Sequence, residues 1–184
     1  MSDKIPIANL YYLLSYAWDD FREGEEVDVS EDACPDLANL LARVLASGIR
    51  SLAHTGFERQ YLPYREETPR LRGRILVAES YRRMTHRAGR MDCVFDELST
   101  DTPANRILKG TANALMNIPG LTVENHHLVR VARDLFPEAC AMRVTGADFR
   151  RVQLHRNIRR YKLLLHVCEL IHRSLLPEEH SGSR

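Results

Sequence analysis

Lysine is scarce in this 184-residue sequence, because only 3 of its 26 basic residues are lysine and the other 23 are arginine. The sequence also lacks any run of 18 consecutive apolar residues, so we expect no transmembrane helix and no membrane partner. The chain begins with Met1-Ser2-Asp3-Lys4, and its N-terminal segment lacks the basic start and the uniform apolar stretch of a signal peptide. We therefore expect a cytoplasmic protein.

Paired cysteines are also missing. The four cysteines, Cys34, Cys93, Cys140 and Cys168, lie far apart and form no Cys-x-x-Cys motif, so we interpret them as buried, reduced thiols. Cys168 and His172 are four residues apart and could share a helix face. One such pair is more often a core residue and a residue at the edge of the core than a metal site. We expect no metal and no cofactor.

The common motifs of nucleotide binding and of hydrolysis are absent too. No Gly-x-x-x-x-Gly-Lys, Gly-x-Gly-x-x-Gly or Gly-x-Ser-x-Gly occurs. Four acids lie close together in the sequence: Asp92, Asp96, Glu97 and Asp101. A metal-dependent nuclease needs such carboxylates with a nearby lysine, and no Asp/Glu-x-Lys is present. We interpret the acids as a strand end and a helix start, and we expect a protein that is not an enzyme.

Charge is unevenly distributed along the chain. Residues 1–57 carry a net charge of −6 and residues 58–184 a net charge of +7. A basic patch at 143–162 holds one acid, Asp148, and seven bases: Arg143, Arg150, Arg151, Arg156, Arg159, Arg160 and Lys162. One interpretation is nucleic-acid binding through Arg150, Arg151, Arg156, Arg159 and Arg160. The other is a solvated face that pairs with the chain's own acidic loop at 23–32.

Helical spacing of apolar residues covers most of the chain. We expect helices over about residues 7–21, 35–55, 77–87, 102–118, 121–136 and 156–175. Pro35 and Pro103 suit first turns, and Gly56 suits a helix end. In the 121–136 helix we expect Leu128, Val131 and Leu135 to face inward, and we expect 137–154 to be irregular or mixed.

Residues 57–99 show a different pattern. Arg70, Arg72 and Arg74 alternate with Leu71, Gly73 and Ile75, which predicts a strand with three guanidinium groups on one face. A second alternating stretch, Met91 to Phe95, predicts a strand that pairs with it. The expected fold class is α+β, a mainly helical body with a small antiparallel β finger or barrel-like insertion at 57–99.

Four segments together resemble the McrC family, the partner of the McrB GTPase in modification-dependent restriction systems. They are Ile5–Leu14 with Tyr16–Trp18, Leu71–Ile75, Phe95–Ser99 with Asp101–Lys109, and His155–Asn157 with Arg160 and Tyr161. They occur in the family's order and together span residues 5–176.

The resemblance implies a McrB-binding domain over residues 1–176, whose 57–99 finger enters the pore of a hexameric McrB-like AAA+ GTPase and stimulates GTP hydrolysis. A polar tail follows at 177–184. The family's C-terminal PD-(D/E)xK nuclease domain is expected to be absent from this chain. DNA within the complex and a separate nuclease chain are further partners that the resemblance leaves open.

Candidate partner contacts are Arg70, Arg72, Arg74, Asn105 and Arg106. For Arg72 and Arg74 the alternative is an ion pair with Glu66 or Glu67 of the same chain. Asn105 and Arg106 stand at a helix start, where their side chains could instead orient a loop.

Overall fold

The computed structural model describes residues 34–136, 142–152 and 159–176 and the isolated positions 9, 30 and 139; the side chains of Arg159 and Arg160 are excepted. The chain divides into two compact units. The helical unit contains the described residues up to Glu58 and from Pro103 onwards, and the strand unit runs from Arg59 to Thr102. The helix expected at 7–21 and most of the acidic loop at 23–32 lie outside the described residues.

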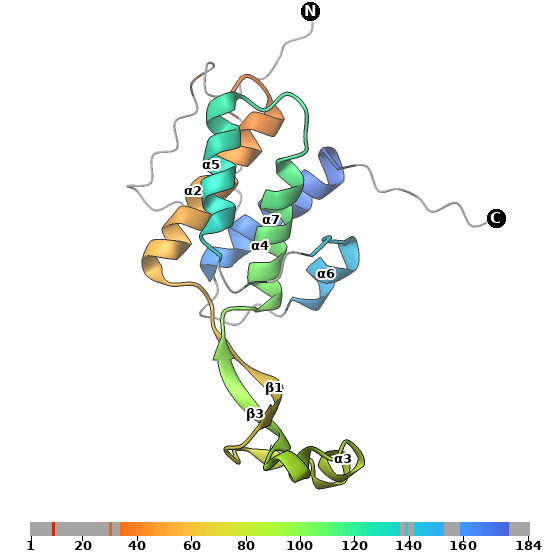
Figure 1. The fold of residues 1–184 in the computed structure, drawn as a ribbon. Helices are drawn as coiled ribbons and strands as arrows, with labels where there is room; N and C mark the ends of the chain where they lie inside the picture. Colours follow the sequence, from red (N-terminus) through yellow and green to blue (C-terminus); the bar gives the residue numbers. More distant parts are fainter. Residues whose placement is uncertain are drawn as a thin grey trace, which may run out of the picture. The chain divides into compact units, whose positions relative to one another are not determined.

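Helices of the helical unit pack around one apolar core. The described helices are α2 (Leu37–Thr55), α4 (Pro103–Leu115), α5 (Val123–Asp134), α6 (Gly146–Arg151) and α7 (Arg159–Ser174). Helix α2 packs against α4, α5 and α7, and α4 also contacts α6 (Figure 1). Fully buried Leu40, Leu45, Leu108 and Ile171 lie in this core. Within the described residues, no helix is both long and apolar enough to span a bilayer.

Capping residues set where these helices begin and end. The Asp36 carboxylate accepts a hydrogen bond from the Asn39 N–H at 2.8 Å, so Asp36 is the N-cap of α2. Pro35 therefore precedes the cap and does not lie in the first turn as predicted. Gly56 ends α2 with a φ of 95°, which confirms the expected stop.

The buried face of α5 is one residue away from the predicted one. Asn125, Val129 and Ala132 are buried, whereas Val131 is 37% exposed, so the inward placement of Val131 was wrong. The prediction counted apolar residues only, whereas the buried side of α5 includes the polar side chain of Asn125. The Asn125 amide donates to Asn39 Oδ1 at 2.9 Å and its oxygen accepts from Arg43 Nη1 at 3.0 Å, which satisfies it inside the protein.

The strand unit contains a three-stranded antiparallel sheet in the order β1-β3-β2. Its elements are β1 (Gln60–Thr68), β2 (Arg74–Ile75), α3 (Val77–Arg82), the 3₁₀ helix η1 (Thr85–Ala88) and β3 (Met91–Ser99). The predicted strand at 91–95, its antiparallel pairing and the α+β class are confirmed.

Two local predictions for the strand unit were wrong. Only Arg74 and Ile75 of the 70–75 stretch form a strand, because Gly73 has a φ of +62° and a Cβ there would lie 2.3 Å from the Val94 carbonyl oxygen. The chain therefore turns at Gly73. The single helix expected at 77–87 is broken at Met84, whose φ of 57° is left-handed.

A buried tyrosine joins three segments of the helical unit. The Tyr161 hydroxyl donates to Asn105 Oδ1 at 2.7 Å and accepts from the Glu58 N–H at 2.8 Å. The Asn105 amide donates in turn to the Glu58 carbonyl at 3.0 Å. Burial raises the pKa of Tyr161 to about 12, so the phenol keeps the proton that it donates at neutral pH.

We predict that Tyr161→Phe lowers the free energy of unfolding by about 1–3 kcal/mol, because Asn105 and the Glu58 amide each lose a buried partner. Thermal or denaturant unfolding measures the change. The same substitution at Tyr61, which is 72% exposed, is the matched control and should shift stability by less than about 0.5 kcal/mol. Equal effects of the two substitutions would contradict the assignment.

Candidate interaction surface of the strand unit

The interior of the strand unit is polar. Cys93 is the one buried apolar side chain between residues 59 and 102, all of which are described. The buried polar and charged residues of the same unit are Thr68, Ser80, Thr85, Asp92 and Thr102. Hydrophobic burial alone therefore cannot hold α3 and η1 on the sheet, and the hydrogen bonds of these polar groups have to contribute.

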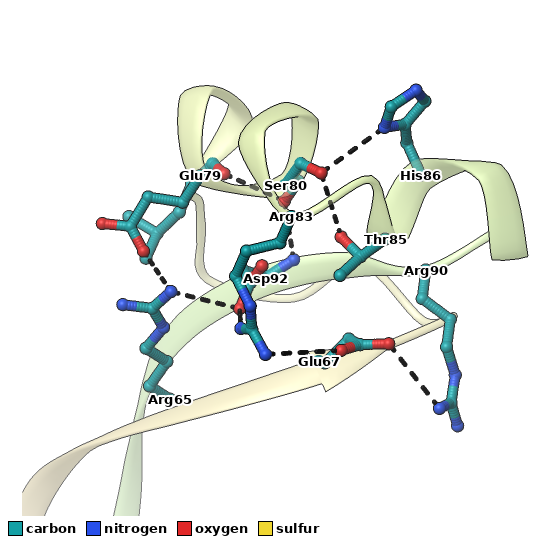
Figure 2. Close-up of polar contacts among 10 residues, drawn as sticks. Arg65, Glu67, Glu79, Ser80, Arg83, Thr85, His86, Arg90 and Asp92 are labelled. Carbon is teal, nitrogen blue, oxygen red and sulfur yellow. Dashed lines mark hydrogen bonds and ion pairs between the residues drawn. The ribbon is translucent and has the colours of Figure 1, made fainter.

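Asp92 is the centre of this polar interior. Its side chain is 1% exposed, and its Oδ1 accepts from Arg83 Nη1 at 2.6 Å and from Arg65 Nη2 at 3.2 Å (Figure 2). Arg65 also pairs with Glu79 of α3. These contacts raise the pKa of Arg65, with the hydrogen bond to Asp92 as the largest cause. Two strands and the segment around α3 are thus tied to one carboxylate.

Backbone hydrogen bonds around Ser80 complete the attachment. The Asp92 N–H donates to Ser80 Oγ at 2.8 Å, and the Ser80 hydroxyl donates to the Leu76 carbonyl at 2.9 Å. The Leu76 N–H in turn donates to the Asp92 carbonyl at 2.8 Å. Thr85 Oγ1 donates to the Ser80 carbonyl at 3.3 Å, which fixes the start of η1 (Figure 2). Both short helices are therefore positioned by Asp92 and Ser80.

The three candidate arginines of the strand unit differ in their surroundings. Arg72 pairs with Glu66 at 2.6 Å, and its guanidinium lies 3.6 Å from the centroid of the Phe95 ring. The alternative of an intrachain ion pair therefore holds for Arg72. Arg70 and Arg74 are exposed, and neither side chain forms an ion pair with a residue that the structure describes. Of the three candidates, therefore, only Arg70 and Arg74 are available as cations for another molecule.

Large apolar side chains on the outside of the strand unit accompany these cations. Exposed examples are Tyr61, Tyr64, Leu71, Val77, Tyr81, Met84 and Leu98. Among described residues the helical unit adds three more, Leu37, Val123 and Val131. Exposed apolar side chains that gather in one small unit are typical of a binding surface.

The partner-contact role expected for Asn105 is corrected by its burial. Asn105 is 0% exposed and its side-chain oxygen and nitrogen are engaged with Tyr161 and Glu58, so it cannot touch a partner directly. It organises the start of α4, which is the alternative stated above. Arg106 is half-buried in the same helix and already has an interaction within the chain.

The structure describes only part of the basic patch at 143–162. Arg150 and Arg151 are exposed at the end of α6. Asp148, the one acid of the patch, accepts from the Thr145 N–H at 2.8 Å and from its hydroxyl at 2.7 Å, and this hydroxyl is the largest cause of a lowered pKa. Arg156 and the side chains of Arg159 and Arg160 lie outside the described residues.

Cys168 and His172 are engaged with protein groups. Burial raises the pKa of the Cys168 thiol to about 12, and His172 Nε2 lies 3.1 Å from the Thr111 hydroxyl. Burial also lowers the pKa of His172, which keeps its ring neutral near pH 7. No three His, Cys, Asp or Glu side chains converge in the described part of the chain.

Sequence patterns did not indicate the Asp92 cluster. The sequence pattern places Asp92 with the other acids at a strand end and a helix start, and it does not indicate that Asp92 is buried. Burial of Asp92 depends on α3 and η1 folding back over the sheet, and a single acid between apolar residues carries no sign of that contact. The nearest signal is the excess of arginine on both sides, at Arg65 and at Arg83.

Comparisons with known proteins agree on one family. A family model described as McrBC 5-methylcytosine restriction system component matches residues 4–184. The type IV methyl-directed restriction enzyme EcoKMcrBC of Escherichia coli K12 is 32% identical over 181 residues, which are 97% of this chain and 51% of that protein. The chain therefore spans about half the length of the curated relative that it matches.

Two solved structures share the fold. A chain of the cryo-EM structure of the Thermococcus gammatolerans McrBC complex superposes with a TM-score of 0.69 at 20% identity, covering 90% of this chain and 50% of that chain. A refined half-complex from the tetradecameric assembly of T. gammatolerans McrB AAA+ hexamers with bound McrC gives a TM-score of 0.64 at 19% identity. That match covers 91% of this chain and 42% of the other.

We predict that Asp92→Ala loosens α3 and η1 without unfolding the helical unit. Arg65 and Arg83 are half-exposed and can reach water, so the cost comes from lost hydrogen bonds and is about 1–3 kcal/mol. Hydrogen exchange should become faster at amides 76–90 and stay unchanged in α4. Asp96→Ala, at an exposed position of the same strand, is the control; unchanged protection at 76–90 in Asp92→Ala would refute the role of Asp92.

Proposed function

This chain belongs to the family of McrBC 5-methylcytosine restriction system components, and from that premise we propose that it is the McrB-binding part of a McrC-like subunit. In this proposal the chain docks on a McrB-like AAA+ GTPase hexamer and stimulates GTP hydrolysis. The T. gammatolerans assembly, described as McrB AAA+ hexamers with bound McrC, supports the choice of partner. The likeness of fold supports the corresponding place for this chain in such a complex.

One observation carries the docking role: the strand unit holds a polar interior and an apolar, arginine-rich exterior. Cys93 is its one buried apolar residue, while Val77, Tyr81 and Met84 are more than half exposed. Exposing apolar groups while burying polar ones costs free energy in an isolated unit. A partner that covers the exposed groups offsets this cost, so we assign the contact to the strand unit.

We further propose that the described residues bind and stimulate but do not cleave DNA. Asp92, one of the four clustered acids considered for a metal-dependent nuclease, is held by Arg83 and Arg65. Asp96 and Glu97 are consecutive in β3, so their side chains point to opposite faces of the sheet. Their positions suit an exposed strand end better than a shared Mg²⁺ site.

Nucleic-acid binding by the end of α6 is a second candidate function. Arg150 and Arg151 are exposed, and the nearby Asp148 carboxylate is engaged with Thr145. Phosphate contacts through these arginines would make DNA affinity fall steeply with salt. DNA bound in this way would belong to the assembled restriction complex.

We predict that Arg70→Glu combined with Arg74→Glu reduces stimulated GTP hydrolysis by at least about tenfold, because like charges would then face acidic groups of the partner. Arg72 is left unchanged since its reversal would break the contacts with Glu66 and Phe95 and confuse docking with folding. The measurement is GTP turnover by the cognate McrB-like GTPase with and without the variant chain, in the absence of DNA.

Arg150→Glu with Arg151→Glu is the matched control, because it reverses the same number of exposed arginines in the helical unit. We expect it to leave stimulation within about twofold of wild type and to weaken DNA binding if the second candidate function holds. Full stimulation by the Arg70/Arg74 variant would place the charged contact elsewhere. Absence of stimulation by the wild-type chain would refute the proposed function.

A further inference from the structure

Five side chains of α3, of η1 and of the link between them are exposed. We call them together the α3–η1 face: Val77, Tyr81, Arg82, Met84 and Arg87. Val77, Tyr81 and Met84 expose 52%, 60% and 55% of their surface. Val77 and Tyr81 are four residues apart in α3 and therefore lie on the same side of that helix.

The α3–η1 face is built on a rigid support. Helix α3 has six residues, too few to be stable alone in water. Its one buried residue is Ser80, whose hydroxyl oxygen accepts a hydrogen bond from the Asp92 N–H (Figure 2). The same hydroxyl donates to the Leu76 carbonyl. The unit thus uses a buried carboxylate and a buried hydroxyl to hold a helix whose Val77 and Tyr81 side chains stay more than half exposed. Such preorganisation lowers the entropic cost of binding a partner.

Electrostatics indicates the charge of the partner. Residues 69–90 contain seven arginines and one acid, Glu79. Arg82 and Arg87 of the α3–η1 face form no ion pair with a residue that the structure describes, whereas Arg83 is held by Asp92. The cations that remain available on this face favour a negatively charged surface.

Composition distinguishes an acidic protein from a nucleic acid. The strand unit contains nine arginines and no lysine, and the face combines arginine with tyrosine and methionine. Tyrosine, methionine and arginine are enriched in the buried centres of protein interfaces, where lysine and glutamate are depleted. Phosphate contacts would use the arginines but would leave Val77 and Met84 in water.

We propose that the α3–η1 face is a part of the strand unit that binds the partner GTPase, against a surface where acidic side chains surround an apolar patch. This inference rests on the proposed function and adds the α3–η1 face to Arg70 and Arg74 as a contact of the strand unit. Tyr81, which stacks on His86 with ring centroids 4.3 Å apart, is the aromatic centre of the contact. Arg82 and Arg87 supply its charged rim.

Two variants separate the apolar and charged parts of this contact. Tyr81→Ser removes the aromatic centre, and Arg82→Glu with Arg87→Glu reverses the rim. We expect each variant to weaken binding of the full chain to the cognate McrB-like GTPase at least about tenfold. Biolayer interferometry at salt concentrations from about 50 to about 300 mM measures the affinity and its salt dependence. The arginine variant should also flatten the salt dependence, whereas Tyr81→Ser should not.

Tyr61→Ser is the matched control, since Tyr61 is exposed at the opposite end of β1 from the Glu67–Asp92 pair. It should bind within about twofold of wild type. Asp92→Ala adds an independent readout, because it changes no exposed side chain of the face yet should weaken binding by releasing α3. Melting temperatures of all variants, taken by circular dichroism, show whether the helical unit remains folded.

The outcomes separate this inference from the proposed function. Wild-type binding with unchanged affinity in both face variants overturns the inference and leaves the proposed function standing. An equal loss in Tyr61→Ser also overturns it, because the contact would not be specific to this face. Loss of binding to a 30-base-pair duplex, about three helical turns, with unchanged GTPase affinity would assign the face to DNA. A wild-type chain that does not bind the GTPase refutes both.

Discussion

The buried carboxylate of Asp92 is the interaction on which the strand unit depends. A segment of this size cannot bury a large apolar core, and here Cys93 is the one apolar side chain that is fully enclosed. The stabilising contacts are instead the ion pairs of the Asp92 carboxylate with Arg65 and Arg83 and the hydrogen bond that the Asp92 N–H donates to Ser80. Because these bonds are directional, they fix where α3 and η1 lie on the sheet as well as holding them there.

The two units follow opposite rules for placing apolar residues. In the helical unit, leucine and isoleucine side chains of α2, α4 and α7 fill a continuous core, and buried polar groups such as Asn39 and Asn125 satisfy one another. In the strand unit the buried residues are mostly polar, and seven large apolar side chains are exposed. The continuous apolar core of the helical unit and the exposed apolar side chains of the strand unit are the physical basis for our proposal that the strand unit is the docking part.

Membership of the McrBC family gives this division a biological setting. The chain corresponds to about half of its E. coli relative, and its fold recurs in two T. gammatolerans complexes. Arginine is suited to the surface that we assign to docking, because its guanidinium stacks on aromatic rings and forms paired hydrogen bonds with carboxylates. Arg72, with Phe95 below and Glu66 beside it, shows both properties within the chain itself.

The sequence by itself determined the fold class, most helix positions, the strand at 91–95 and the family, because these follow from local periodicity, capping residues and motif order. Capping by Asp36 and the stop at Gly56 are decided within a few residues of chain. Tertiary structure alone decided the turn at Gly73, the burial of Asp92 and Asn105, and the pairing of Arg72 with Glu66. Each of these depends on which distant segment covers or approaches the residue. The identity of a polar residue does not indicate whether another segment buries it or water surrounds it.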